Sequence, residues 1–127
     1  MDKQKTLLEQ FSLSVARFKE AIALEKNVAN RDSAIKRFEL TFDLAWKTLK
    51  EYLGEHFGVS VNSPKATFRE AFQQGLTQYS DDWIKITDDR NLTVHTYDED
   101  LAEDVYHKLP KALSMFEELL TKLKENE

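Results

Sequence analysis

The segment IKRFELTFDLAWKTLKEYL, from Ile35 to Leu53, carries the clearest helical pattern of the chain. Apolar side chains recur in it at alternating steps of three and four residues, which is the spacing of one helical face. Other apolar side chains fall outside this face, more than one packing partner requires. We therefore predict a helix that is central to the molecule or meets another subunit with its second face. The face holds Ile35, Phe38, Phe42, Ala45, Leu49 and Tyr52, and Leu40, Leu44, Trp46 and Leu53 lie outside it.

Two more long helices are expected. Apolar residues repeat at helical spacing from Leu8 to Ile22, and the pattern fades in the polar stretch EKNVANRD. A last helix carries apolar residues from Leu101 to Leu123 and has Pro110 in its interior. Because proline lacks a backbone N–H and clashes with the preceding turn, Pro110 should kink this helix or split it.

Two shorter helices lie between the long ones. Ser63 and Pro64 form a helix start, with the serine as N-cap and the proline as first helical residue, and this helix should stop at Gly75. A further helical segment surrounds Trp83. We predict an all-α fold, an antiparallel up-and-down four-helix-type bundle with a short extra helix, as a single domain over residues 1–127.

Composition limits the possible functions. The net charge of −5 gives no global attraction for nucleic acid, so RNA binding would need a local basic patch. The absence of cysteine excludes disulfides, thiol catalysis and thiolate metal sites, and no glycine-rich phosphate loop is present. The sequence shows neither a signal peptide nor a stretch of transmembrane length. We expect a soluble, cytoplasmic protein without contact to a membrane and without a metal or other cofactor.

The stretch DDRNLTVHTYDED, residues 88–100, combines varied chemistry with a weak helical pattern. Its segment TYDE fits a capping box, with Thr96 as N-cap and Glu99 reaching back. The last helix is then expected to start at Tyr97, with His95 just outside it. On one continuous helix Arg90 and His95 would lie about 140° apart, so their convergence needs a break between them or a second copy of the chain.

Two interpretations of these residues remain open. In the first, Arg90 pairs with Asp88 or Asp89, while His95 satisfies a helix end and Tyr97 packs against the protein. In the second, Arg90 holds a phosphate and His95 moves protons, since histidine changes its charge near neutral pH.

The segment RNLTVH, from Arg90 to His95, resembles the R-x4-6-H signature of HEPN domains. With Tyr97 it gives R-x4-H-x-Y, which is similar to the HEPN partner of minimal nucleotidyltransferases, the nucleotidyltransferase substrate-binding protein family. The segments RFELTFDLAWKTLKEYL, SPKATFREAFQQGL and DDWIKITDDRNLTVHTYDE also resemble helices of that family. The resemblance extends from about Arg31 to Leu120.

The resemblance implies a homodimer in which Arg90 and His95 of both subunits face a shared cleft. It implies a metal-independent endoribonuclease, the toxin of a type VII-like toxin–antitoxin pair, encoded beside a cognate minimal nucleotidyltransferase as antitoxin. That partner would silence the toxin by transferring AMP from ATP to Tyr97. Two copies of His95 could act as base and acid on an RNA substrate, Arg90 could stabilise the phosphate, and Asn91 could orient a phosphate or the histidine.

Other features favour different interpretations. Acidic residues near the motif should repel RNA, and Lys36, Arg37, Lys47 and Lys50 supply a basic rim only if their helix faces the cleft. The chain could instead be a non-catalytic adaptor that presents a substrate to the nucleotidyltransferase. A carboxylate-bridged metal site would need two E-x-x-H pairs, whereas only Asp104 and His107 have comparable spacing. His56 is expected to interact with carbonyls at its helix end.

Overall fold

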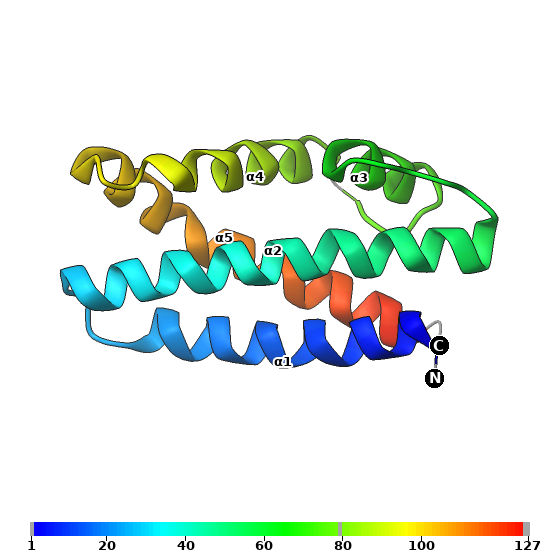
Figure 1. Ribbon diagram of the computed structural model, residues 1–127, viewed down its shortest axis with the longest axis horizontal. Helices are drawn as coiled ribbons and strands as arrows, with labels where there is room; N and C mark the ends of the chain where they lie inside the picture. Colours follow the sequence, from blue (N-terminus) through cyan, green and yellow to red (C-terminus); the bar gives the residue numbers. More distant parts are fainter. Residues whose placement is uncertain (1, 79, 126–127) are drawn as a thin grey trace.

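The computed structural model describes residues 2–78 and 80–125. In this part of the chain every regular element is helical, which confirms the all-α bundle. Figure 1 shows the long helices running up and down, with α4 and the short helix α3 following one another along the same side of α2, and with both chain ends at one end of the bundle. The elements are α1 (Lys3–Ala23), α2 (Val28–Phe57), α3 (Pro64–Gln73), α4 (Ser80–Leu92), a 3₁₀ turn (Thr93–His95) and α5 (Glu99–Glu125).

Helix α2 is the central helix of the bundle. It contacts α1, α3, α4 and α5, so it is surrounded on several sides. Of its apolar side chains outside the predicted face, Leu53 is buried, Leu44 and Trp46 are half-buried, and Leu40 is 40% exposed. The apolar surplus of α2 therefore packs mainly within the chain. The six residues of the predicted face, Ile35, Phe38, Phe42, Ala45, Leu49 and Tyr52, are all buried.

Aromatic rings fill the core between these helices. Phe116 of α5 packs edge-on against Phe11 and Phe18 of α1, at centroid distances of 6.2 and 5.9 Å. Phe68 of α3 stacks on Trp83 of α4 at 4.4 Å, which joins the two shorter helices. Burying one such side chain contributes roughly 1.5–3 kcal/mol, so ring packing is a main source of stability.

The starts and ends of the helices follow mostly from local chemistry. Ser63 accepts a hydrogen bond from the N–H of Ala66 at 3.3 Å, and Pro64 is the first helical residue, as predicted. Gly58 ends α2 in the left-handed conformation that favours glycine, with φ 66°. Helix α5 runs through Pro110 without interruption, so the predicted possibility of a split there is wrong. None of the described helices combines the length and apolarity that crossing a membrane requires.

The predicted start of the last helix is wrong by two residues. Helix α5 begins at Glu99, and Asp98 caps it by accepting a hydrogen bond from the N–H of Leu101 at 3.2 Å. The hydroxyl of Thr96 instead donates to the carbonyl of Thr93. Glu99 does not close a capping box, because it binds the buried Arg31 at 2.7 Å.

Candidate functional site

The helix is interrupted between Arg90 and His95, as a site that uses both side chains requires. Helix α4 ends at Leu92, and the 3₁₀ turn carries His95. The buried Thr93 lies between them and holds Arg90 in two ways. Its hydroxyl donates to the Arg90 carbonyl at 2.7 Å and accepts from the Arg90 guanidinium at 3.1 Å. The end of α4 therefore fixes the direction in which Arg90 leaves the helix.

The carboxylate partner of Arg90 comes from α2. Two guanidinium nitrogens lie 3.4 Å from the two carboxylate oxygens of Asp43. The predicted pairing with Asp88 or Asp89 is wrong, because these residues bind Lys65 and Lys108. The side chains of Arg90 and Asp43 are 22% and 40% exposed, so water and anions can reach this pair. Charge-assisted hydrogen bonds of 3.4 Å are long, which leaves Arg90 available to a competing phosphate.

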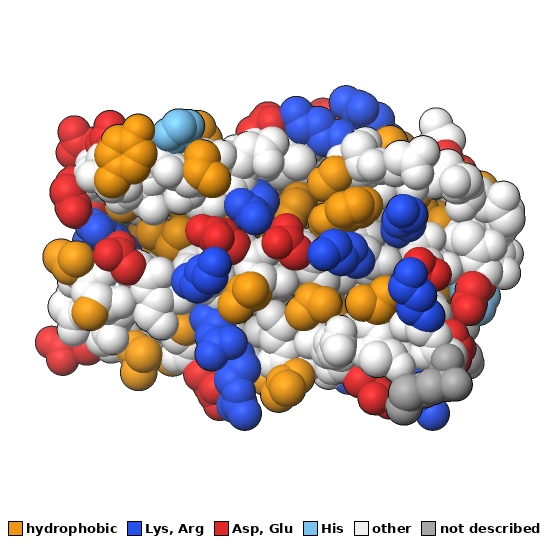
Figure 2. Space-filling model, viewed as in Figure 1, with side chains coloured by type: hydrophobic (Ala, Val, Ile, Leu, Met, Phe, Trp, Pro, Cys, Tyr) orange, Lys and Arg blue, Asp and Glu red, His pale blue; other side chains and the backbone are white. Residues whose placement is uncertain are grey.

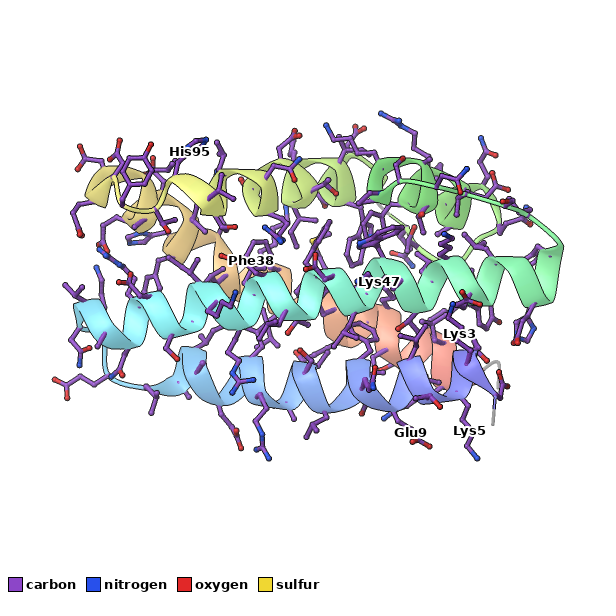
Figure 3. All side chains as sticks on the ribbon, in the orientation of Figure 1. Lys3, Lys5, Glu9, Phe38, Lys47 and His95 are labelled. Atoms are coloured by element: carbon purple, nitrogen blue, oxygen red, sulfur yellow. The ribbon has the colours of Figure 1, made fainter. Side chains whose placement is uncertain are left out.

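His95 and Tyr97 form an exposed pair beside this arginine. The Nδ1 atom of His95 lies 3.3 Å from the Tyr97 hydroxyl, and the rings meet edge to face. Figure 3 shows His95 at the outer edge of the bundle, pointing away from the core. Tyr97 is 81% exposed, so the interpretation in which it packs against the protein is wrong. Both polar groups face solvent, where a substrate or an enzyme could reach them.

Arg90, Asn91 and His95 do not contact one another through hydrogen bonds between their side chains in the described part of the chain. Among the residues that the structure describes, no hydrogen bond or ion pair joins Arg90 to His95, and Asn91 is exposed with a free amide. Leu92, Val94 and Tyr97 add exposed apolar surface around His95. This arrangement suits a site that a second copy completes.

Basic residues of α2 lie next to Arg90. Lys36, Lys47 and Lys50 fall within about 40° of Asp43 around the helix axis, whereas Arg37 lies about 120° away. Figure 2 shows Lys and Arg side chains along this face of α2, with acidic side chains between them. Three of the four residues expected to form a basic rim therefore lie on the side of α2 that faces Arg90.

The other two histidines have separate surroundings. His56, in the last turn of α2, stacks on Tyr52 at a centroid distance of 4.0 Å, and among the described residues it makes no side-chain hydrogen bond to a helix-end carbonyl. His107 is exposed on α5, with Nδ1 2.7 Å from the carbonyl of Glu103. Within residues 2–78 and 80–125, no three His, Cys, Asp or Glu side chains are grouped to hold a metal ion.

Sequence comparison defines the class of this helical protein. A family model described as nucleotidyltransferase substrate binding protein like matches residues 6–125, so the chain belongs to that family. This confirms the resemblance seen in the motif and in the helices around it.

Among curated proteins, the chain is 31% identical over 96 residues to the "Probable ribonuclease HepT" of Haemophilus influenzae. The match covers 72% of this chain and 66% of that relative, which is slightly less than two thirds of its length.

Two solved structures are similar to the bundle. A protein from Thermus thermophilus is 39% identical with a TM-score of 0.85, over 89% of this chain and 98% of that one. A Haemophilus influenzae protein, described as having the fold of a substrate-binding domain of a nucleotidyltransferase, shares the fold at a TM-score of 0.70. That protein is 24% identical, and the match covers 95% of this chain and 96% of its own.

Proposed function

We propose that this protein is a HEPN toxin of a type VII-like toxin–antitoxin pair, a metal-independent endoribonuclease that acts in the cytoplasm as a homodimer. The observation that carries the proposal is the exposed His95, beside Tyr97, on a turn that directly follows the anchored Arg90. Similarity to a protein named as a probable ribonuclease supports the same assignment.

The chemistry requires two proton transfers and a stabilised phosphate. One His95 removes the proton of the RNA 2′-hydroxyl, and this oxygen attacks the adjacent phosphorus. The bond from phosphorus to the 5′-oxygen of the next nucleotide breaks, and the partner subunit's His95 donates a proton to that oxygen. Arg90 stabilises the negative charge of the pentavalent phosphate. To do so, its guanidinium releases Asp43 and binds the substrate instead. Asn91, exposed next to Arg90, orients the phosphate.

Tyr97 is the proposed point of control. Its hydroxyl is accessible to a cognate minimal nucleotidyltransferase, which would transfer AMP from ATP to this oxygen and release pyrophosphate. The added phosphate would lie beside His95, because the two side chains are 3.3 Å apart before modification. A negative group at this position would occupy the anion site and exclude RNA.

Cleavage of RNA by the chain purified without its nucleotidyltransferase tests this proposal. Intact mass first establishes that Tyr97 carries no AMP, and a mixed RNA pool is then incubated in EDTA. We expect cleavage that is lost in His95→Ala and retained in His107→Ala, a matched change of another exposed histidine. Absence of cleavage by the unmodified dimer would favour the non-catalytic adaptor.

A further inference from the structure

Two lysines of α2 continue the line of basic residues beyond the proposed site. Lys47 and Lys50 follow Asp43 by one and two helical turns, about 6 and 10 Å farther along the helix axis. Figure 3 shows Lys47 on the same long helix, farther from the His95 end of the molecule. Both lysines therefore lie on a line that leads away from Arg90.

Unlike Lys36 and Arg90, these two lysines have no carboxylate partner among the described residues. Lys36 is paired with Glu39 at 3.5 Å, and Arg90 is paired with Asp43. No ion pair or side-chain hydrogen bond is made by Lys47 or Lys50 within the described part of the chain. Their charges are therefore available to an external anion.

On the side of His95 away from Lys47 and Lys50, the surface is negatively charged. Asp98, Glu99 and Asp100 are exposed at the start of α5, and Figure 2 shows acidic side chains gathered at that end of the molecule. A phosphate backbone is repelled from the α5 start and attracted along α2. The charge distribution thus defines one direction for a bound strand.

We propose that Lys47 and Lys50 bind phosphates of the single RNA strand on one side of the scissile phosphate, so that the strand leaves Arg90 along α2. This inference rests on the proposed ribonuclease function and deepens it. The contacts are with phosphates, so they strengthen binding of all RNA sequences alike.

The salt dependence of RNA binding tests the proposal. In a His95→Ala background, which prevents cleavage, the dissociation constant of a labelled single-stranded RNA is measured between about 50 and 200 mM salt. In a plot of the logarithm of the dissociation constant against the logarithm of the salt concentration, each phosphate contact to a single strand contributes a slope of about 0.7. The double variant Lys47→Gln with Lys50→Gln should therefore reduce the slope by about 1.4. The matched control is Lys5→Gln with Lys124→Gln, which removes the same charge from two exposed lysines without ion pairs in the described chain.

An unchanged slope in the Lys47 and Lys50 variant, or an equal reduction in the control variant, would overturn the proposal. The proposal would also be overturned if the variant kept the salt dependence of RNA binding but lost binding to the nucleotidyltransferase. Lys47 and Lys50 would then belong to a surface that binds a protein. RNA cleavage by the wild-type chain separates these results from failure of the ribonuclease function. If the wild type cleaves RNA while the slope stays unchanged, only the role of the two lysines is wrong.

Discussion

Arg31 is a buried cation that connects the start of α2 to the start of α5. Its side chain is 5% exposed and binds Glu99 at 2.7 Å and Glu103 at 3.2 Å, as well as the neighbouring Asp32. Glu99 is the first residue of α5, two residues after Tyr97 and four after His95. The ion pairs of Arg31 therefore fix the end of the bundle at which the proposed site lies.

Replacing Arg31 by alanine should destabilise the fold by about 2–3 kcal/mol, because hydrogen bonds between charged groups and side-chain packing are lost. Arg31→Lys should cost less, since the charge remains. Asp32→Asn should cost under about 1 kcal/mol, because Asp32 is 55% exposed. Urea unfolding measures the stability of all three variants. An Arg31→Ala protein as stable as the wild type would contradict the structural role of Arg31.

Glu103 should contribute to the acid sensitivity of the protein. A hydrogen bond from Lys26 lowers the pKa of the Glu103 carboxyl below its usual 4.5, and Arg31 adds to the effect. A lowered pKa means that the stabilisation is present above pH 4.5 and is lost as the pH falls through the lowered value. The free energy of unfolding of Glu103→Gln should therefore fall less steeply below pH 4.5 than that of the wild type. If the free energy of unfolding of the two proteins depended on pH in the same way, Glu103 would not contribute to the acid sensitivity.

At the scale of the element, the end of α4 is the part of the fold that positions the residues of the proposed site. Thr93 is 4% exposed and joins the backbone and guanidinium of Arg90 through one hydroxyl. A helix that continued past Leu92 would carry Arg90 and His95 on different sides. The 3₁₀ turn thus breaks the helix between Arg90 and His95.

Thr93→Val keeps the shape of this side chain and removes its hydroxyl. We expect a loss of about 1 kcal/mol in stability and about tenfold in the rate of RNA cleavage, because Arg90 loses its anchor. Thr93→Ser restores the hydroxyl and should recover most of the rate. If Thr93→Val and Thr93→Ser cleave RNA at the same rate, the hydroxyl does not position Arg90.

The predictable parts of the fold are those that depend on neighbours in the sequence. The apolar face of α2 and the start of α3 at Ser63 follow from helical spacing and local capping. The pairing of Arg90 with Asp43 joins residues 47 positions apart, and no local pattern indicates it. The start of α5 escapes local reasoning for a related reason, because Glu99 is held by Arg31, 68 positions earlier.

At the scale of the whole molecule, we propose a site that two chains build together. The segment around His95 exposes Leu92, Val94 and Tyr97, with exposed fractions of 38%, 67% and 81%. Exposed apolar side chains that cluster around a polar site are typical of an interface. The proposed dimer would cover this surface and bring the two His95 side chains to one cleft.

Val94→Asp should therefore convert a dimer into monomers and abolish RNA cleavage, because a buried unpaired carboxylate strongly disfavours association. Sedimentation velocity measures the oligomeric state of the wild type and the variant. Leu13→Asp is the control, since Leu13 is 57% exposed on α1 outside this segment, and it should leave the dimer intact. An active wild-type monomer would contradict the shared site.

Subunit mixing tests the shared pair of histidines most directly. Wild-type chains are mixed with increasing amounts of His95→Ala chains, exchanged to equilibrium, and assayed for RNA cleavage in EDTA at constant wild-type concentration. If each cleavage uses His95 of both subunits, activity should fall in proportion to the remaining wild-type dimer and approach zero at large excess of the variant. Activity that stays constant as His95→Ala chains are added, or no cleavage by wild type alone, would contradict the account.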